Sequence, residues 1–273
     1  MTSTQIVLPI SLFILACYCL SAILIFRSLN QSQAPARWLM LTPALVGSIV
    51  QVVLLKQLIY PQTGVINLEF FTALCLISWL VSLQILISSL YRPLETLGIV
   101  MFPFSGLTAL LASLYPAQQP IPIASTPYLQ SHILISVIAY SLLMLSALQA
   151  ITLAYQDRSI RSHHPGGFIR RLPPLHDMET LLFQMLGFGF IFLTTSLVTG
   201  FFFVENLFAQ HLVHKTILSI ISWVILAILL YGRFKFGWRG KTAIRWTLVA
   251  FVFIMLAYFG SKLVLEFILT GTN

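Results

Sequence analysis

Residues 205–240 read ENLFAQHLVHKTILSIISWVILAILLYGRFKFGWRG, and this stretch decides the fold. A short polar segment with His211 and His214 leads into an apolar run from Ile217 to Leu230, and a basic loop bounded by glycines follows. An α-helix needs roughly 20 apolar residues to cross a bilayer. The stretch therefore predicts a membrane helix with two histidines at one end and a cluster of cations at the other.

The composition excludes a water-soluble fold. Of the 273 residues, 58% are hydrophobic and 8% are charged, and the mean hydropathy is +0.94. A soluble domain carries about 25% charged residues. The net charge of +8 does not indicate nucleic-acid binding, because the cations lie in short loops between apolar runs. The three cysteines lie inside apolar runs without a C-x-x-C pair, which argues against a thiol–disulfide oxidoreductase.

Eight apolar segments are each long enough to span a bilayer. They are roughly Ile6–Phe26, Leu39–Leu58, Phe70–Leu90, Leu97–Tyr115, Tyr128–Ala154, Met178–Phe203, Val213–Gly232 and Ala243–Ile268. Backbone groups in lipid need partners within the chain, so these segments are expected to be helices. We predict an all-α polytopic membrane protein with about eight transmembrane helices and one transmembrane domain over residues 1–273.

The cations predict the orientation of the chain, because cytoplasmic loops are enriched in Lys and Arg. Twelve fall in or beside the odd-numbered connections: Arg27, Arg37, Arg92, Arg158, Arg161, Arg170, Arg171, Arg233, Lys235, Arg239, Lys241 and Arg245. Only Lys56, Lys215 and Lys262 fall on the other side. Both termini are therefore predicted to lie outside the cytoplasm. The basic loop is expected to orient the protein and to do no chemistry.

Polar residues inside the segments are few. Gln84, Gln149 and Gln184 are the most polar candidates for burial, and mid-membrane charge is almost absent, which weakens a transporter reading. At the start of the sixth segment, Asp177 is expected to be the N-cap, and Glu179 suits the positive end of that helix.

The histidines fall into two groups. A basic cytoplasmic loop holds three of them: His163, His164 and His176. On the outer side, His132 stands near the entrance of the fifth segment, and His211 and His214 stand at the entrance of the seventh, three residues apart on one helical face. Imidazole is a common ligand of haem iron and of other metals. Because no catalytic triad, phosphate loop or H-E-x-x-H motif is present, we expect no enzyme.

Four stretches of the second half carry a family resemblance. They are SHILISVIAYS at 131–141, LPPLHDMETLLFQMLGFGFIFLTTSLVTG at 172–200, HKTILSIISWVILAILLYGRFKFGWRGK at 214–241 and YFGSKLVL at 258–265. Together they resemble the cytochrome c assembly (CcsA/CcmC-type) haem-handling membrane proteins, in particular their YpjD-like inner-membrane branch. The resemblance covers residues 121–273, whereas residues 1–120 match only as four hydrophobic helices.

The resemblance implies a bacterial inner-membrane protein that handles haem at its periplasmic face for attachment to apocytochrome c. It implies haem as a non-covalent cofactor, and apocytochrome c or other maturation proteins as partners beside the lipid bilayer. His132 matches the external haem-ligand histidine of the family. Our expectation from position is a haem at the outer mouths of the fifth and seventh segments, with His214 or His211 as the second ligand.

The sequence also departs from the family pattern. ENLFAQHLV stands where a tryptophan-rich haem-binding loop precedes His214 in the family, and Tyr231 stands where an intramembrane histidine is expected. No histidine follows the YFG of residues 258–260. Two other functions therefore stay open: a membrane scaffold or regulator of haem metabolism that has lost haem transfer, and a small-molecule permease.

Overall fold

In the computed structural model, the described residues are 3–29, 36–60, 67–91, 94–115, 127–162, 172–203 and 210–260. Over these ranges the chain is helical without strands, and eight helices are long and apolar enough to cross a membrane. They are α1 (Ser3–Ser28), α2 (Arg37–Ile59), α3 (Phe70–Tyr91), α4 (Gly98–Leu114), α5 (Pro127–Arg161), α6 (Leu175–Phe203), α7 (Gln210–Phe236) and α8 (Lys241–Met255). The predicted all-α polytopic fold is thereby confirmed.

Two short helical turns complete the fourth and eighth spans. A 3-10 turn, η1 (Glu95–Leu97), precedes α4, and a π-helix, η3 (Leu256–Gly260), continues α8. Many large apolar side chains of the helices are exposed, among them Phe202, which is 72% exposed, and Val252, which is 53% exposed. Such surfaces are expected where a helix faces lipid, because hydrocarbon chains are as apolar as the side chains themselves.

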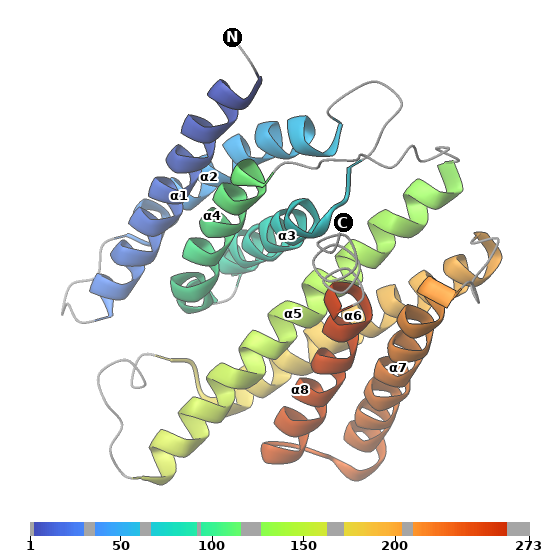
Figure 1. The fold of residues 1–273 in the computed structure, drawn as a ribbon. Helices are drawn as coiled ribbons and strands as arrows, with labels where there is room; N and C mark the ends of the chain where they lie inside the picture. The colour runs from blue at the N-terminus through green and yellow to red at the C-terminus, as the bar shows by residue number, and fades with distance from the viewer. Residues whose placement is uncertain are drawn as a thin grey trace. The chain divides into compact units, whose positions relative to one another are not determined.

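The chain divides into two compact units (Figure 1). Unit 1 comprises residues 1–124 with 167–172, and unit 2 comprises residues 125–166 with 173–273. Unit 1 therefore contains α1 to α4, and unit 2 contains α5 to α8. The prediction of one transmembrane domain over residues 1–273 stays a prediction, as does the sidedness inferred from the cations.

A buried glutamine joins the four helices of unit 1. Gln51 of α2 is fully buried, and its side-chain oxygen accepts hydrogen bonds from Tyr18 of α1 at 2.8 Å and from Ser105 of α4 at 3.2 Å. Its amide nitrogen donates to the sulfur of Cys75 on α3 at 3.3 Å. Interhelical hydrogen bonds of this kind contribute about 0.6 kcal/mol each in a membrane protein. Gln51 therefore helps to hold unit 1 together.

Burial of the other glutamines differs from the prediction in part. Gln149 is fully buried, as predicted, whereas Gln84 is half-buried. Gln184 is exposed, so its predicted burial is wrong. The hydropathy pattern finds the spans but not which face of each helix packs inward, and Gln51 was overlooked for the same reason.

The helices of unit 2 form a ring of four. α5 packs on α6 and α8, and α7 packs on the same two helices, so α5 and α7 lie diagonally across the ring. The core between them is built from fully buried leucines, including Leu182, Leu186, Leu226 and Leu229. The N-terminal ends of α5 and α7 lie at one end of unit 2, and those of α6 and α8 lie at the other (Figure 1).

Two helices of unit 2 continue beyond their predicted ends. α5 reaches Arg161 instead of Ala154, because Asp157 and Arg161 form an i,i+4 ion pair that extends the helix past the apolar run. α7 reaches Phe236 instead of Gly232, so Arg233 and Lys235 lie in its last turn, where cations favour the negative end of the helix. Hydropathy marks the membrane-spanning part of a helix rather than its last residue.

The start of α6 also differs from the prediction. α6 begins at Leu175, and the amide of Asp177 donates to the carbonyl of Pro174 at 3.0 Å. Asp177 is therefore a residue of the first turn, and its predicted N-cap role is wrong. The carbonyl of Pro174 also accepts from the amide of Met178 at 3.1 Å, so the first turn of α6 closes on Pro174, three residues before Asp177.

Candidate functional site

The candidate site begins with His132, in the second turn of α5. Its ring is half-buried against α6, and Nδ1 lies 3.1 Å from Oγ1 of Thr199. The Thr199 hydroxyl also lies 2.8 Å from the carbonyl oxygen of Thr195 and 3.0 Å from that of Ser196, so its proton is directed to its own helix. The hydroxyl oxygen can then accept from Nδ1–H of His132, and the backbone of Ser196 is a second partner of the ring. This assigns the neutral tautomer that leaves the lone pair on Nε2.

A glycine makes room for the His132 ring. A Cβ atom added to Gly200 would lie 3.0 Å from Cε1 of His132, which is tighter than nine in ten real Cβ contacts. Ser136 and Ser196 bond to each other at 2.7 Å between α5 and α6, and Ser136 also donates to the His132 carbonyl at 2.6 Å. The ring is therefore held between two helices that are joined within one turn of it.

The other two histidines predicted for the outer side lie on α7. His214 is exposed, and the side chain of His211 lies outside the described residues. α5 and α7 begin at the same end of unit 2 (Figure 1), so His132 and His214 stand at the same end, on diagonal helices. Within the described residues no three His, Cys, Asp or Glu side chains gather as a metal site. The pairing of His132 with His214 stays a prediction.

The ring of Tyr258 links α5 and α7. Tyr258, carried by the π-helix η3, lies 5.5 Å from the ring of Tyr140 on α5. The ammonium of Lys215 on α7 lies 5.6 Å from the centroid of the same Tyr258 ring. Lys215 follows His214 directly, and Tyr140 lies eight residues after His132, about 12 Å further along α5, so the cation stands near the histidines and the two phenol rings lie deeper in unit 2. π-Helical turns are often found at functional sites.

Sequence reasoning missed Thr199, Gly200, Tyr258 and Lys215 as members of this site. The signal was present, because all four lie in the stretches 172–200, 214–241 and 258–265 that carry the family resemblance. What the sequence could not show is which helix the His132 ring faces, since Thr199 stands 67 residues further along the chain.

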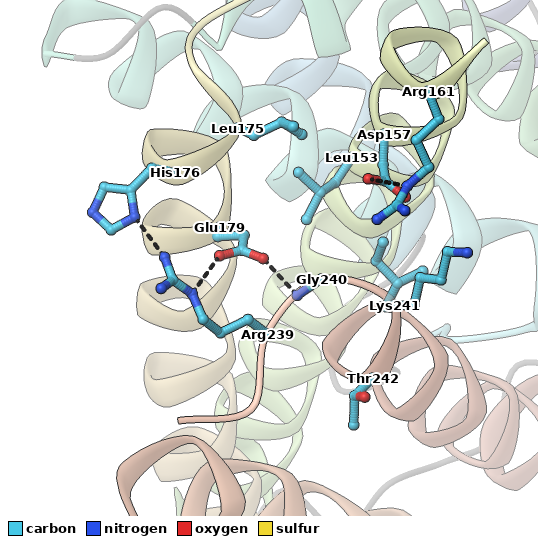
Figure 2. Close-up of a pocket in the computed structure, with 11 residues that line it drawn as sticks. Leu153, Asp157, Arg161, Leu175, His176, Glu179, Arg239, Gly240, Lys241 and Thr242 are labelled. Carbon is cyan, nitrogen blue, oxygen red and sulfur yellow. Dashed lines mark hydrogen bonds and ion pairs between the residues drawn. The ribbon is translucent and has the colours of Figure 1, made fainter. Parts of the chain in front are cut away.

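The opposite end of unit 2 carries the basic residues (Figure 2). Glu179 of α6 accepts hydrogen bonds from Nε of Arg239 at 3.3 Å and from the amide of Gly240 at 2.5 Å, and Arg239 also reaches Nδ1 of His176 at 3.0 Å. Glu179 therefore binds the start of α8 rather than serving only the dipole of its own helix. His163 and His164 lie outside the described residues.

The basic turn between α7 and α8 is well defined. α7 ends at a left-handed glycine, Gly237, with φ of 65°, whose amide donates to the carbonyl of Arg233 at 3.1 Å. The Arg233 guanidinium donates to the carbonyl of Trp238 at 3.2 Å and lies 4.5 Å from the centroid of the Phe183 ring. Arg233 and Arg239 thus have structural contacts in addition to the orienting role predicted for them.

Comparison with known proteins places these features in a family context. The family model described as Cytochrome C assembly protein matches residues 38–269, which include helices of both units. The inner membrane protein YpjD of Escherichia coli K12 is 30% identical over 261 residues, which cover 94% of this chain and 98% of that protein. The match therefore extends further toward the N-terminus than the stretches quoted from the sequence.

Two more distant relatives carry other names. The cytochrome c biogenesis protein CcsA of Chlamydomonas reinhardtii is 24% identical over 259 residues, covering 82% of this chain and 72% of that protein. The protein HemX of Brevibacillus brevis is 23% identical over 200 residues, covering 71% of this chain and 73% of that protein. No solved structure matches the chain.

Proposed function

The chain belongs to the cytochrome c assembly protein family, and from this premise we propose that it holds haem during cytochrome c maturation. It is a multi-pass inner-membrane protein with eight helices able to span the bilayer. Family membership supports a haem-related role in maturation. The finer proposal is that haem is presented at the periplasmic face, at the outer end of unit 2, with His132 as an axial ligand.

The hydrogen bond of His132 carries the proposal. Histidines that ligate metals almost always donate their other ring N–H to an oxygen acceptor, which fixes the tautomer and the orientation of the ring. Thr199 is that acceptor, so Nε2 keeps its lone pair for iron. The close approach of Gly200 restricts the ring further. The surroundings of His132 therefore suit it to be one axial ligand of haem iron.

The neighbouring groups suit the rest of a haem molecule. Haem combines an apolar ring with anionic propionates, and Lys215 would supply a cation for a propionate. Tyr140 and Tyr258 would offer aromatic surface to the ring. His214 is our candidate for the second axial ligand, with His211 as its alternative. Haem itself would be the cargo that is passed to an apocytochrome c.

We propose a carrier and not an enzyme. The chain's own residues would bind and orient haem, and no group of the site is assigned a bond-making step. A non-catalytic scaffold or regulator of haem metabolism is the second candidate. It is favoured by one observation: ENLFAQHLV replaces the tryptophan-rich loop of the family before His214.

Haem content distinguishes the two candidates. Wild type, His132→Ala and His214→Ala are purified at matched protein levels after haem supplementation, with His176→Ala at the opposite end as the matched control. The carrier proposal expects haem to be lost in His132→Ala and retained in His176→Ala. Loss in His214→Ala as well would identify a ligand pair. Equal haem in all four proteins, or none in wild type, would remove the site and favour the scaffold.

A further inference from the structure

A cleft of about 590 Å³ opens at the basic end of unit 2, where α5 ends and α6 and α8 begin (Figure 2). Leu153, Leu175 and Ile244 give it an apolar wall, and charged side chains from the three helices and the α7–α8 turn complete it. We call it the basic cleft. An apolar wall beside charged groups suits an amphiphilic ligand, with its polar part held by the charges.

The carboxylates of the basic cleft are already in use. Both oxygens of Asp157 lie 3.0 Å from Nε of Arg161, four residues along α5. The two oxygens of Glu179 are bound by Nε of Arg239 and by the amide of Gly240. Figure 2 shows the Asp157–Arg161 pair apart from the connected set formed by Glu179, Arg239, Gly240 and His176. The carboxylates thus neutralise two of the cations without filling the cleft.

Hydrogen-bond donors are left over. Lys241, which lines the basic cleft, has no anionic partner among the residues that the structure describes. The terminal nitrogens of the Arg161 guanidinium likewise bind nothing within the described ranges, because its carboxylate partner is bound through Nε. Thr242 adds a hydroxyl, and the first turn of α8 adds amides at its positive end. The basic cleft therefore has more hydrogen-bond donors than acceptors and more cations than anions, which indicates an oxyanion ligand.

The position of the basic cleft points to the membrane surface. Trp238 lies in the turn just before α8, 5.7 Å from the ring of Trp246. Tryptophan is enriched at the level of lipid headgroups, and basic pockets between transmembrane helices bind anionic headgroups on the cytoplasmic side. A phosphate group of a lipid would meet the donors while its chains leave toward the apolar wall.

We propose that the basic cleft binds a phosphate group, supplied by an anionic phospholipid of the adjacent leaflet. This site is separate from His132, which lies at the other end of unit 2. Binding would hold the ends of α5, α6 and α8 together, because the cleft is lined by all three. Lys241 makes the main contribution, since it is the one Lys or Arg lining the cleft that no carboxylate of the described residues pairs with.

Native mass spectrometry of the detergent-purified full chain tests the proposal. Retention of phosphatidylglycerol is compared with that of phosphatidylcholine in wild type, Lys241→Gln and Lys235→Gln. Lys235 is an exposed lysine of the last turn of α7 that does not line the cleft, so it is the matched control. A basic residue at an anionic membrane surface contributes about 1 kcal/mol, so Lys241→Gln should reduce phosphatidylglycerol retention about fivefold. Equal retention in the two variants would overturn the site.

A second variant is expected to increase phosphatidylglycerol retention rather than reduce it. Asp157→Asn removes the carboxylate that occupies Arg161, so it should increase phosphatidylglycerol retention. A decrease would contradict the idea that free donors limit binding of the phosphate group.

A thermal stability assay distinguishes a lipid headgroup from free phosphate as the source of the bound phosphate group. The melting temperature of delipidated protein is measured with sodium phosphate, with sodium chloride at equal ionic strength, and with phosphatidylglycerol. A larger rise in melting temperature with phosphatidylglycerol than with sodium phosphate supports a lipid as the ligand. A larger rise with sodium phosphate would overturn the assignment to a lipid.

Discussion

Removing one hydroxyl group should weaken haem binding without changing the fold. In Thr199→Val the side chain keeps its shape, but the Nδ1–H of His132 loses the acceptor that lies 3.1 Å away. The ring is half-buried and the backbone of Ser196 remains beside it, so the lost hydrogen bond costs about 0.5–1.5 kcal/mol. Mutation of a residue that hydrogen-bonds to a metal-ligating histidine typically lowers metal affinity 10- to 100-fold. We therefore expect haem affinity to fall by about tenfold, at the lower end of that range.

The assay is a haem titration of the apo protein in nanodiscs, followed by the growth of the Soret band. Thr195→Val is the matched control, because Thr195 is exposed one turn away and its hydroxyl, among the residues that the structure describes, bonds to the carbonyl of Ile191 in its own helix at 2.9 Å. Thr199→Ser keeps the hydroxyl and should bind close to wild type. If Thr199→Val and Thr195→Val bind haem equally well, the role assigned to Thr199 is refuted.

Three other predictions address the site and the fold. Gly200→Ala should displace the His132 ring and lower haem affinity while the protein stays folded, because the new Cβ would lie 3.0 Å from Cε1; unchanged titration curves would exclude this packing role. Reporter fusions at Asn273 should report the periplasm and those at Gly166 the cytoplasm, and the opposite signal at either position contradicts the predicted orientation. Glu179→Gln should lower the melting temperature, because the ion pair and the charged acceptor at the start of α8 are weakened, and an unchanged melting curve in nanodiscs would argue against it.

The sequence predicts the spans well, because hydropathy and length are the properties that a bilayer selects. It predicts their ends less well. The Asp157–Arg161 pair lengthens α5 beyond the apolar run, and Pro174 starts α6 before Asp177. These are local effects of polar residues at the membrane surface, where hydropathy no longer discriminates between a helix and a loop.

Contacts between helices are the part that the sequence does not supply. His132 could be placed at the outer end of α5 from its position, but its contact with Thr199 depends on the rotation of α5 against α6. Glu179 suited the start of its own helix, yet in the structure it binds the amide of Gly240 at the start of α8. Such pairs depend on how the helices pack against each other, and this packing cannot be read from a single sequence.

The central claim, that His132 ligates haem iron, is tested most directly by changing the ligand atom. In haem-loaded His132→Met protein a thioether would replace the imidazole, and axial methionine raises the reduction potential of haem. The measurement is the midpoint potential of the bound haem, with its absorbance spectrum, in wild type and in His132→Met. We predict a shifted spectrum and a higher potential in the variant. The same spectrum and potential in both proteins would show that the iron is held by other residues.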